Sequence, residues 1–277
     1  MSPVRNRVNT RAALIATALA GVVAAGSIAS SYFGLPTLAV SASFVRKELP
    51  PLPPPPPPKV VHRETPDAVK AIYMSQCAAT SDAFRTSLFK LADETEINAI
   101  VVDIKDYSGT VGFPAKTAIP GGKGCSTGDF EELVKEMHKR DIYVVGRMTV
   151  FQDPLYTATH PEQAVQRKSG GVWKDNKGLA FVDVGAKPFW DYIIALSKEA
   201  HMLGVDEINF DYIRYPSDGP MSETLYMHSS TTGSHQENLE RFFVYLNQQM
   251  KVEQDGHMPV LSADLFGMTA TNYDDLN

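Results

Sequence analysis

The stretch that decides the fold is Asp206-Glu207-Ile208-Asn209-Phe210-Asp211-Tyr212-Ile213-Arg214-Tyr215-Pro216. Ile208 and Phe210 alternate with Asn209 and Asp211 over a short run, which is typical of a buried strand. Asp211 lies where the apolar run stops, and Arg214 follows three residues later. A carboxylate and a guanidinium at the carboxyl end of a buried strand stand where α/β barrels carry their catalytic groups. A salt bridge that merely closes the strand end is the alternative.

Working outward from this stretch, short apolar runs alternate with segments of helical spacing. The other strand-like runs are residues 71–75, 99–104, 142–148 and 260–265. Such alternation predicts parallel strands joined by right-handed crossovers. Before the fourth strand, residues 165–173 predict a hairpin because Gly170-Gly171 tolerates positive φ. A closed barrel needs eight strand–helix units and only five are visible, so the pattern fits an open doubly wound sheet or an incomplete barrel.

Composition limits the function classes. The 277 residues are 43% hydrophobic and 21% charged, as in globular proteins. The formal net charge of −6 and the pI near 5.7 provide no basic surplus for tracking phosphates. Nucleic acid is therefore excluded as an expected partner.

The N-terminus has the pattern of a membrane segment. Residues 1–11 are basic, with Arg5, Arg7 and Arg11, and we expect them in the cytoplasm. Residues 12–34 lack charge and predict a transmembrane signal anchor close to the ~20 residues that a spanning helix needs. A cleaved signal peptide ending near Val40-Ser41-Ala42 is the alternative. Either interpretation places the following domain outside the cytoplasm, at the cell surface or in the periplasm, or secreted after cleavage.

A proline-rich spacer follows the apolar segment. Residues 50–58 are almost continuous proline, which favours a stiff polyproline II conformation. We interpret residues 35–59 as a linker, with a ligand for an aromatic groove as the alternative. The folded domain is then expected over residues 60–277.

Cysteine and histidine positions give no metal site. Cys77 and Cys125 lack metal-type spacing, so they are one disulfide or two free thiols, and free thiols are favoured. All seven histidines fall outside the strand ends, where a catalytic zinc site would need them. No metal or cofactor is therefore expected.

Acidic and basic residues follow the strands instead. They are Asp103, Lys105 and Asp106 after the second strand, Arg147 in the third, Asp211 and Arg214 after the fourth, and Asp264 after the fifth. Because parallel strands end on one side, these residues should converge. Glycoside hydrolysis needs one carboxylic acid to protonate the leaving oxygen and one carboxylate to act as nucleophile or activate water. Burial and nearby arginines can separate the pKa values of the two.

Other chemistries have weaker support. Magnesium held by Asp103, Asp106 and Asp211 stays open, since oxygen ligands suffice. Gly121-Gly122-Lys123-Gly124 lacks the spacing of a phosphate loop. Among the aromatic residues near the strand ends, Trp173 and Tyr212 are the favoured platforms for sugar rings.

Several motifs together resemble a known family. They are Val101-Val102-Asp103-Ile104-Lys105-Asp106, Gly146-Arg147, Asp183, Phe210-Asp211-Tyr212-Ile213-Arg214-Tyr215-Pro216 and Ser262-Ala263-Asp264-Leu265-Phe266-Gly267. From about Ala68 onward the chain resembles the glycoside hydrolase family catalogued as DUF4015. The resemblance implies a (β/α)8 TIM barrel on membrane-attached or exported bacterial proteins. It implies that Asp211 is the nucleophile and Asp264 the nearest candidate for the acid/base. The family continues for three further strand–helix units, so we expect a truncated chain in which only the first five units are present.

The expected function is that of a membrane-tethered glycoside hydrolase acting on extracellular or cell-surface polysaccharide. Asp211 and Asp264 are the predicted catalytic residues. The predicted substrate-binding residues are Asp103, Lys105, Asp106, Arg147, Tyr212, Arg214 and Trp173. A non-catalytic carbohydrate-binding or cell-wall scaffold protein is the first alternative, and a metal-dependent lyase or hydrolase is the second.

Overall fold

The computed structural model describes residues 60–251 and 257–267. Its main sheet contains five parallel strands in the order β1-β2-β3-β5-β7. They are β1 (Ala71–Met74), β2 (Ala99–Lys105), β3 (Tyr143–Thr149), β5 (Glu207–Asp211) and β7 (Val260–Ala263). Each predicted strand is confirmed, and consecutive strands are neighbours, as in a singly wound barrel rather than a doubly wound sheet.

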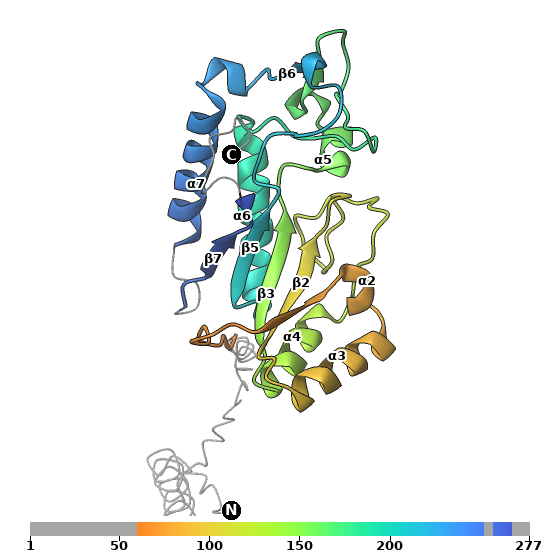
Figure 1. Cartoon of the computed structure of the whole chain (residues 1–277), viewed down its shortest axis with the longest axis vertical. Coiled ribbons are helices and arrows are strands. Elements are labelled where there is room, and N and C mark those ends of the chain that lie inside the picture. The colour runs from red at the N-terminus through yellow and green to blue at the C-terminus, as the bar shows by residue number, and fades with distance from the viewer. Residues whose placement is uncertain (1–59, 252–256, 268–277) are drawn as a thin grey trace, which may run out of the picture. The chain divides into compact units, whose positions relative to one another are not determined.

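Helices connect the strands and cover one face of the sheet (Figure 1). They are α2 (Gln76–Ala79), α3 (Asp82–Glu94), α4 (Phe130–Lys139), α5 (Pro154–Thr159), α6 (Lys187–Met202) and α7 (His235–Met250). Ser81 caps α3 through its side chain, and Ser234 with Glu237 forms a capping box on α7. The buried face of α3 includes Phe89, whereas Phe84 and Leu91 are 62% and 43% exposed.

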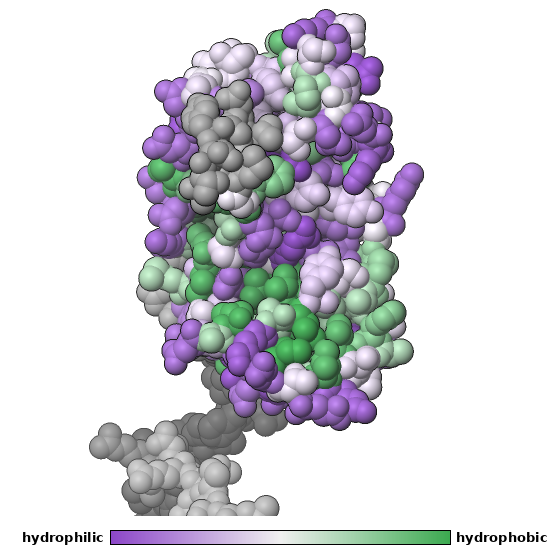
Figure 2. Space-filling view, viewed as in Figure 1, coloured by the Kyte–Doolittle hydropathy of each residue, from purple (hydrophilic) through white to green (hydrophobic). Residues whose placement is uncertain are grey.

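The two faces of the sheet have different chemistry because side chains alternate along a strand. Toward the helices, Ile100, Val144 and Ile208 join the main hydrophobic core. The opposite face carries only a small apolar cluster of Ala99, Tyr143 and Val145. Figure 2 shows polar residues gathered above a hydrophobic band on the side viewed in Figure 1.

Two long connections follow β3 and β5 and are joined to each other. The hairpin predicted at residues 165–173 is present, with the Trp173 amide donating to the Val165 carbonyl at 2.8 Å. Its first strand, β4 (Gln166–Arg167), pairs antiparallel with β6 (Thr224–Leu225) of the later connection. Asp183 is fully buried and accepts hydrogen bonds from the amides of Gly185 and His228 at 3.1 and 2.7 Å. This carboxylate therefore holds the two connections together.

The expectation of free thiols is wrong, because Cys77 and Cys125 form a disulfide with Cα atoms 5.0 Å apart. Cys77 lies in α2, directly after β1, and Cys125 lies in the loop after β2. The sequence separation of 48 residues concealed their proximity, which arises because β1 and β2 pair in parallel and end side by side.

The predicted membrane anchor at residues 12–34 and the linker at 35–59 lie outside the described residues. None of the helices in the described ranges combines the length and the hydrophobicity that a membrane span requires.

Candidate active site

A chain of charged and polar side chains crosses the open face of the sheet near the carboxyl ends of its strands. Arg147 of β3 donates to Asp103 of β2 at 2.8 Å and, through its other terminal nitrogen, to Asp211 of β5. Tyr73 of β1 donates its hydroxyl to the second oxygen of Asp103. Each of the four neighbouring strands β1, β2, β3 and β5 thus supplies one residue to a single hydrogen-bonded network.

Strand register explains this convergence. Arg147 of β3 is paired with Asp103 of β2. Thr149, two positions after Arg147 in β3, is paired with Asp211 of β5. Since alternate residues share a face, Arg147 projects between the two carboxylates. The prediction that Asp103, Arg147 and Asp211 meet is confirmed.

The network shifts the acidity of its members. Burial raises the pKa of Asp103, and the hydrogen bonds from Tyr73 and Arg147 oppose this only in part. Burial also raises the pKa of Tyr73, with the nearby Asp103 carboxylate adding to the shift. For Arg147, burial lowers the pKa, but Asp103 and Asp211 outweigh it and the net pKa is raised. Arg147 is therefore a permanent cation beside Asp211.

A second polar group continues the array toward β7. Asn209 of β5 donates to Ser262 at 3.0 Å and to the carboxylate of Asp264 at 3.3 Å. Ser262 donates in turn to Glu207, which also accepts a hydrogen bond of 3.0 Å from Tyr143. Asp264 is exposed, and its amide donates to the Phe210 carbonyl at 2.8 Å.

Asp211 and Asp264 line the same small pocket, of about 90 Å³, together with Tyr212, Arg214, Leu265 and Phe266. Tyr212 has a φ of 52°, an uncommon value for a residue other than glycine, and its amide donates to Asp211 at 2.6 Å. The guanidinium of Arg214 lies 4.8 Å from the ring centroid of Tyr212 and 4.9 Å from that of Phe266. The pocket therefore combines two carboxylates with a cation held between two aromatic rings.

Arg214 does not form the alternative salt bridge with Asp211. Its guanidinium donates to the Tyr215 carbonyl at 3.1 Å and to the Ser217 hydroxyl at 2.9 Å. Burial lowers its pKa. The partner that closes the strand end around Asp211 is Arg147 instead.

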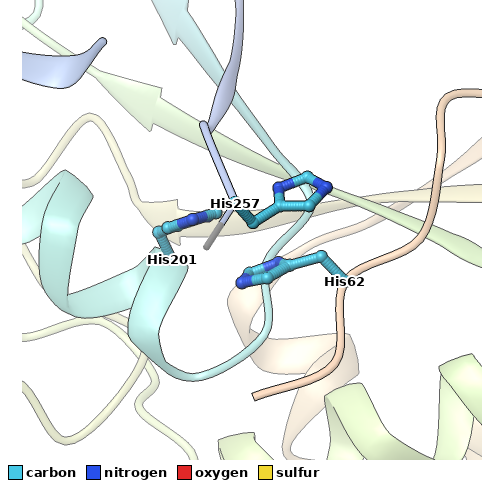
Figure 3. Close-up of side chains that lie close together, drawn as sticks. All are labelled: His62, His201 and His257. Carbon is cyan, nitrogen blue, oxygen red and sulfur yellow. The ribbon is translucent and has the colours of Figure 1, made fainter. Parts of the chain in front are cut away.

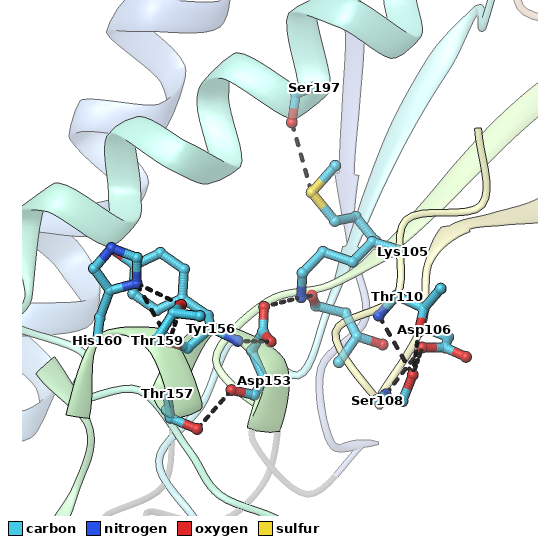
Figure 4. A network of polar contacts seen from close by, with 12 residues as sticks. Lys105, Asp106, Ser108, Thr110, Asp153, Tyr156, Thr157, Thr159, His160 and Ser197 are labelled. Atoms are coloured by element: carbon cyan, nitrogen blue, oxygen red, sulfur yellow. Dashed lines mark hydrogen bonds and ion pairs between the residues drawn. The ribbon is translucent and has the colours of Figure 1, made fainter. Parts of the chain in front are cut away.

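Lys105 does not reach the open face, contrary to its expected substrate-binding position. The register of β2 and β3 shifts between Asp103 and Lys105, so Lys105 lies opposite Met148 on the helix side. There its ammonium group is fully buried, 2.9 Å from Asp153 and 2.6 Å from the Thr149 carbonyl (Figure 4). Asp153 also caps α5 by accepting from the Tyr156 amide at 2.7 Å. Lys105 therefore anchors the β3–α5 connection.

Asp106 and Trp173 also have contacts within the protein that account for their positions. Asp106 accepts from the amide and hydroxyl of Ser108 at 2.9 and 2.6 Å, which closes the turn after β2 (Figure 4). Trp173 is fully buried and donates to the Pro220 carbonyl at 3.0 Å. A ring buried in this way presents no face to a sugar, whereas Tyr212 lines the pocket.

Sequence reasoning missed Tyr73 and Asn209. Tyr73 lies between the apolar residues Ile72 and Met74 of β1. Asn209 lies between the apolar residues Ile208 and Phe210 of β5. That alternation was a usable signal, since it places each polar side chain on the face opposite the core.

The magnesium hypothesis finds no matching geometry among the described residues. The Arg147 guanidinium lies between Asp103 and Asp211, and Asp106 is engaged by Ser108. The one group of three or more metal-type side chains found close together in the described ranges is His62, His201 and His257.

An α/β sheet of the glycosidase barrel type, with carboxylates at its carboxyl edge, agrees with comparisons to known proteins. Residues 71–277 match the model of family DUF4015, described as a "putative glycosyl hydrolase domain", and the chain belongs to this family. A search of curated proteins found no match.

Two solved structures illustrate the similarity. A hypothetical protein from Ruminiclostridium thermocellum ATCC 27405 is 35% identical, with a TM-score of 0.61, over 70% of this chain and 96% of that chain. Alpha-L-fucosidase isoenzyme 2 from Paenibacillus thiaminolyticus is 12% identical, with a TM-score of 0.50, over 70% of this chain and 32% of that chain. This chain thus spans about a third of the fucosidase, and at this identity the likeness concerns the fold.

Proposed function

We propose that the chain is a glycoside hydrolase domain that cleaves an extracellular or cell-surface polysaccharide, with Asp211 as nucleophile and Asp264 as acid/base. The observation that carries this proposal is that both carboxylates, from adjacent strands, line one pocket. Paired carboxylates around a scissile bond are the equipment of glycoside hydrolysis.

The surroundings of the two acids support different roles. Asp211 accepts from the Arg147 guanidinium and from the Tyr212 amide, and these two contacts fix its carboxylate beside the pocket, as the position of a nucleophile requires. Asp264 accepts from the neutral amide of Asn209 and is exposed to an incoming leaving group. It is therefore the better placed of the two to exchange a proton.

The spacing of the strands suggests a stereochemical outcome. Asp211 and Asp264 continue the parallel register in which Phe210 is paired with Ala263. Neighbouring strands lie ~4.8 Å apart, which suits the ~5–5.5 Å separation of carboxyl groups in retaining enzymes better than the ~6.5–9.5 Å of inverting ones. We propose retention of anomeric configuration.

The remaining pocket residues fit the recognition of a sugar. Tyr212 and Phe266 flank Arg214, so aromatic faces and a hydrogen-bond donor lie beside the two acids. Asp103 forms an ion pair with Arg147 and so fixes the position of the Arg147 guanidinium. The proposed substrate-binding surface comprises Asp103, Arg147, Tyr212, Arg214 and Phe266.

We also propose that the domain works outside the cytoplasm. The Cys77–Cys125 disulfide supports this location because such bonds persist in oxidising compartments. The basic and apolar N-terminal sequence supports export with attachment to the membrane through residues 12–34.

The decisive experiment compares Asp211→Asn and Asp264→Asn with the parent on cell-wall and capsular glycans and on aryl glycosides. Asp211→Asn should abolish turnover of both substrate types. Asp264→Asn should lower glycan turnover by about 10²–10⁴ and lower it less on aryl glycosides, whose leaving group needs little protonation. Asp67→Asn, at an exposed position before β1, is the control. Parent-like activity of Asp211→Asn would remove that residue from the mechanism.

A carbohydrate-binding protein without catalysis is the second candidate, because Tyr212, Arg214 and Phe266 could hold a sugar whether or not Asp211 and Asp264 react with it. In that case the parent binds glycans in an array without releasing reducing ends. Asp211→Asn then changes affinity alone.

A further inference from the structure

Three histidines from distant parts of the sequence meet at the end of the sheet opposite the pocket. His62 precedes β1, His201 lies in the last turn of α6, and His257 precedes β7 (Figure 3). The ring of His62 stacks on that of His201 with centroids 4.0 Å apart, and on that of His257 at 4.8 Å. One nitrogen from each residue lies within 4.8 Å of the others.

Each of these rings has a buried nitrogen without a hydrogen-bond partner. The atoms are Nδ1 of His62, Nε2 of His201 and Nδ1 of His257. The His201 side chain is fully buried. Because buried polar atoms in native proteins are nearly always paired, three unpaired ring nitrogens in one cluster call for an explanation.

The contacts around the cluster prepare it for a cation. His201 donates its Nδ1–H to the Val205 carbonyl at 3.0 Å, which leaves the lone pair of Nε2 free. Such a backbone partner is how proteins fix the tautomer of a ligating histidine.

Asp206 supplies negative charge next to the cluster. Its Oδ1 lies 3.7 Å from Nδ1 of His62, and its side chain is fully buried. The amides of Arg63 and Val144 donate to it at 2.7 and 2.8 Å, and His138 donates at 2.9 Å.

We propose that His62, His201 and His257 bind a divalent transition-metal ion, with zinc favoured, which ties the segment before β1 to the starts of β5 and β7. Three imidazoles without thiolate suit zinc, copper or nickel rather than magnesium or calcium. Nitrogens that share one tetrahedral zinc at ~2.0–2.1 Å lie about 3.3 Å apart, so small rotations of the rings would close the site.

The position of the site gives the ion a structural role. His62 contacts groups next to β5 through Asp206, and the neighbouring Thr65 hydroxyl lies 3.0 Å from that of Tyr143 at the start of β3. The segment thus crosses beneath the amino ends of the strands (Figure 1). This end of a barrel serves stability rather than catalysis. The ion would fix the domain at the point where the proline-rich sequence ends.

The test is metal binding by the full chain after dialysis against a chelator. Titration with zinc chloride, followed by calorimetry, should show one ion per chain, and zinc should raise the melting temperature. Cobalt(II) chloride should give the visible absorption of a tetrahedral site. His62→Gln and His257→Gln should each weaken zinc binding by more than about tenfold, since even changes outside the ligands cost 10–100-fold.

Two controls separate this site from the pocket and from unspecific binding. His160→Gln, which alters a histidine outside the cluster, should bind zinc as the parent does. Asp211→Asn should bind zinc normally even if it loses all activity, so the metal proposal and the proposed function fail independently. The absence of stoichiometric binding, or equal affinity in His62→Gln, His257→Gln and the parent, would overturn the proposal.

Discussion

The two ends of the sheet both carry polar clusters, but the clusters are built differently. At the carboxyl end, Arg147 joins Asp103 and Asp211, whose side chains are 6% and 20% exposed, and Asp211 lines a pocket open to solvent. At the amino end, the side chains of His62 and Asp206 are 3% and 0% exposed. Charge near solvent suits a reaction with an external substrate, whereas a closed cluster suits the joining of segments.

The buried aspartates at the two ends show what this difference does to acidity. The pKa of Asp103 is raised because burial outweighs its bonds to Tyr73 and Arg147. The pKa of Asp206 is lowered because its hydrogen bonds, led by that of His138, outweigh burial. Asp206 accepts three hydrogen bonds, whereas Asp103 accepts two. The Asp103 carboxylate therefore has more capacity left for a ligand.

The largest effects should come from replacing two cations at the carboxyl end, Arg147 and Lys105. Arg147→Met should lower turnover by about 10²–10³, because the ion pair that positions Asp211 is lost. Lys105→Met should leave the Michaelis constant unchanged and lower the free energy of unfolding by about 3–5 kcal/mol, because it strands the fully buried Asp153. Steady-state kinetics and urea unfolding of both variants make the comparison. A raised Michaelis constant in a folded Lys105→Met protein would return Lys105 to the substrate site.

The disulfide should have a smaller effect on stability. It closes a loop across the β1 and β2 ends, and its removal in Cys77→Ala/Cys125→Ala should lower the free energy of unfolding by about 2–4 kcal/mol. Since neither cysteine lines the pocket, activity at temperatures well below unfolding should be retained. Urea unfolding of the double variant and of the reduced parent measures the loss. Equal stability with and without the bond would contradict its role as a clamp.

The strands and the acidic rim could be predicted because their signals are local. Each strand is a short apolar run, and parallel order brings Asp103, Arg147 and Asp211 to one edge once the runs are recognised. Tyr73 and Asn209 were overlooked although alternation within their strands places them on the same face.

The errors have non-local causes. Lys105 should share the face of Asp103 by alternation, but the register shift between them turns it to the helix side, and no residue nearby signals that shift. Trp173 is fully buried and donates a hydrogen bond to the Pro220 carbonyl, 47 residues away. The histidine cluster joins three segments that only the folded chain brings together. Long-range contacts of this kind have no signature in one sequence.

The smallest expected effect is on how the free energy of unfolding depends on pH, which should differ between the carboxyl and amino ends of the sheet. The folded-state pKa of Asp103 is raised above the ordinary value near 3.9, so the native state binds more protons than the unfolded chain in the interval between the two values. The contribution of Asp103 to the free energy of unfolding therefore falls as the pH rises from about 4 through the folded-state pKa. Above that pKa the contribution no longer changes with pH. Asp103→Asn cannot titrate, so the unfolding free energy of the parent minus that of the variant should decrease over this range. Urea unfolding of both proteins at pH 4, 5.5 and 7 measures the trend. An increase with pH would mean that Arg147 and Tyr73 outweigh burial, and Asp103 would then resemble Asp206 instead of differing from it.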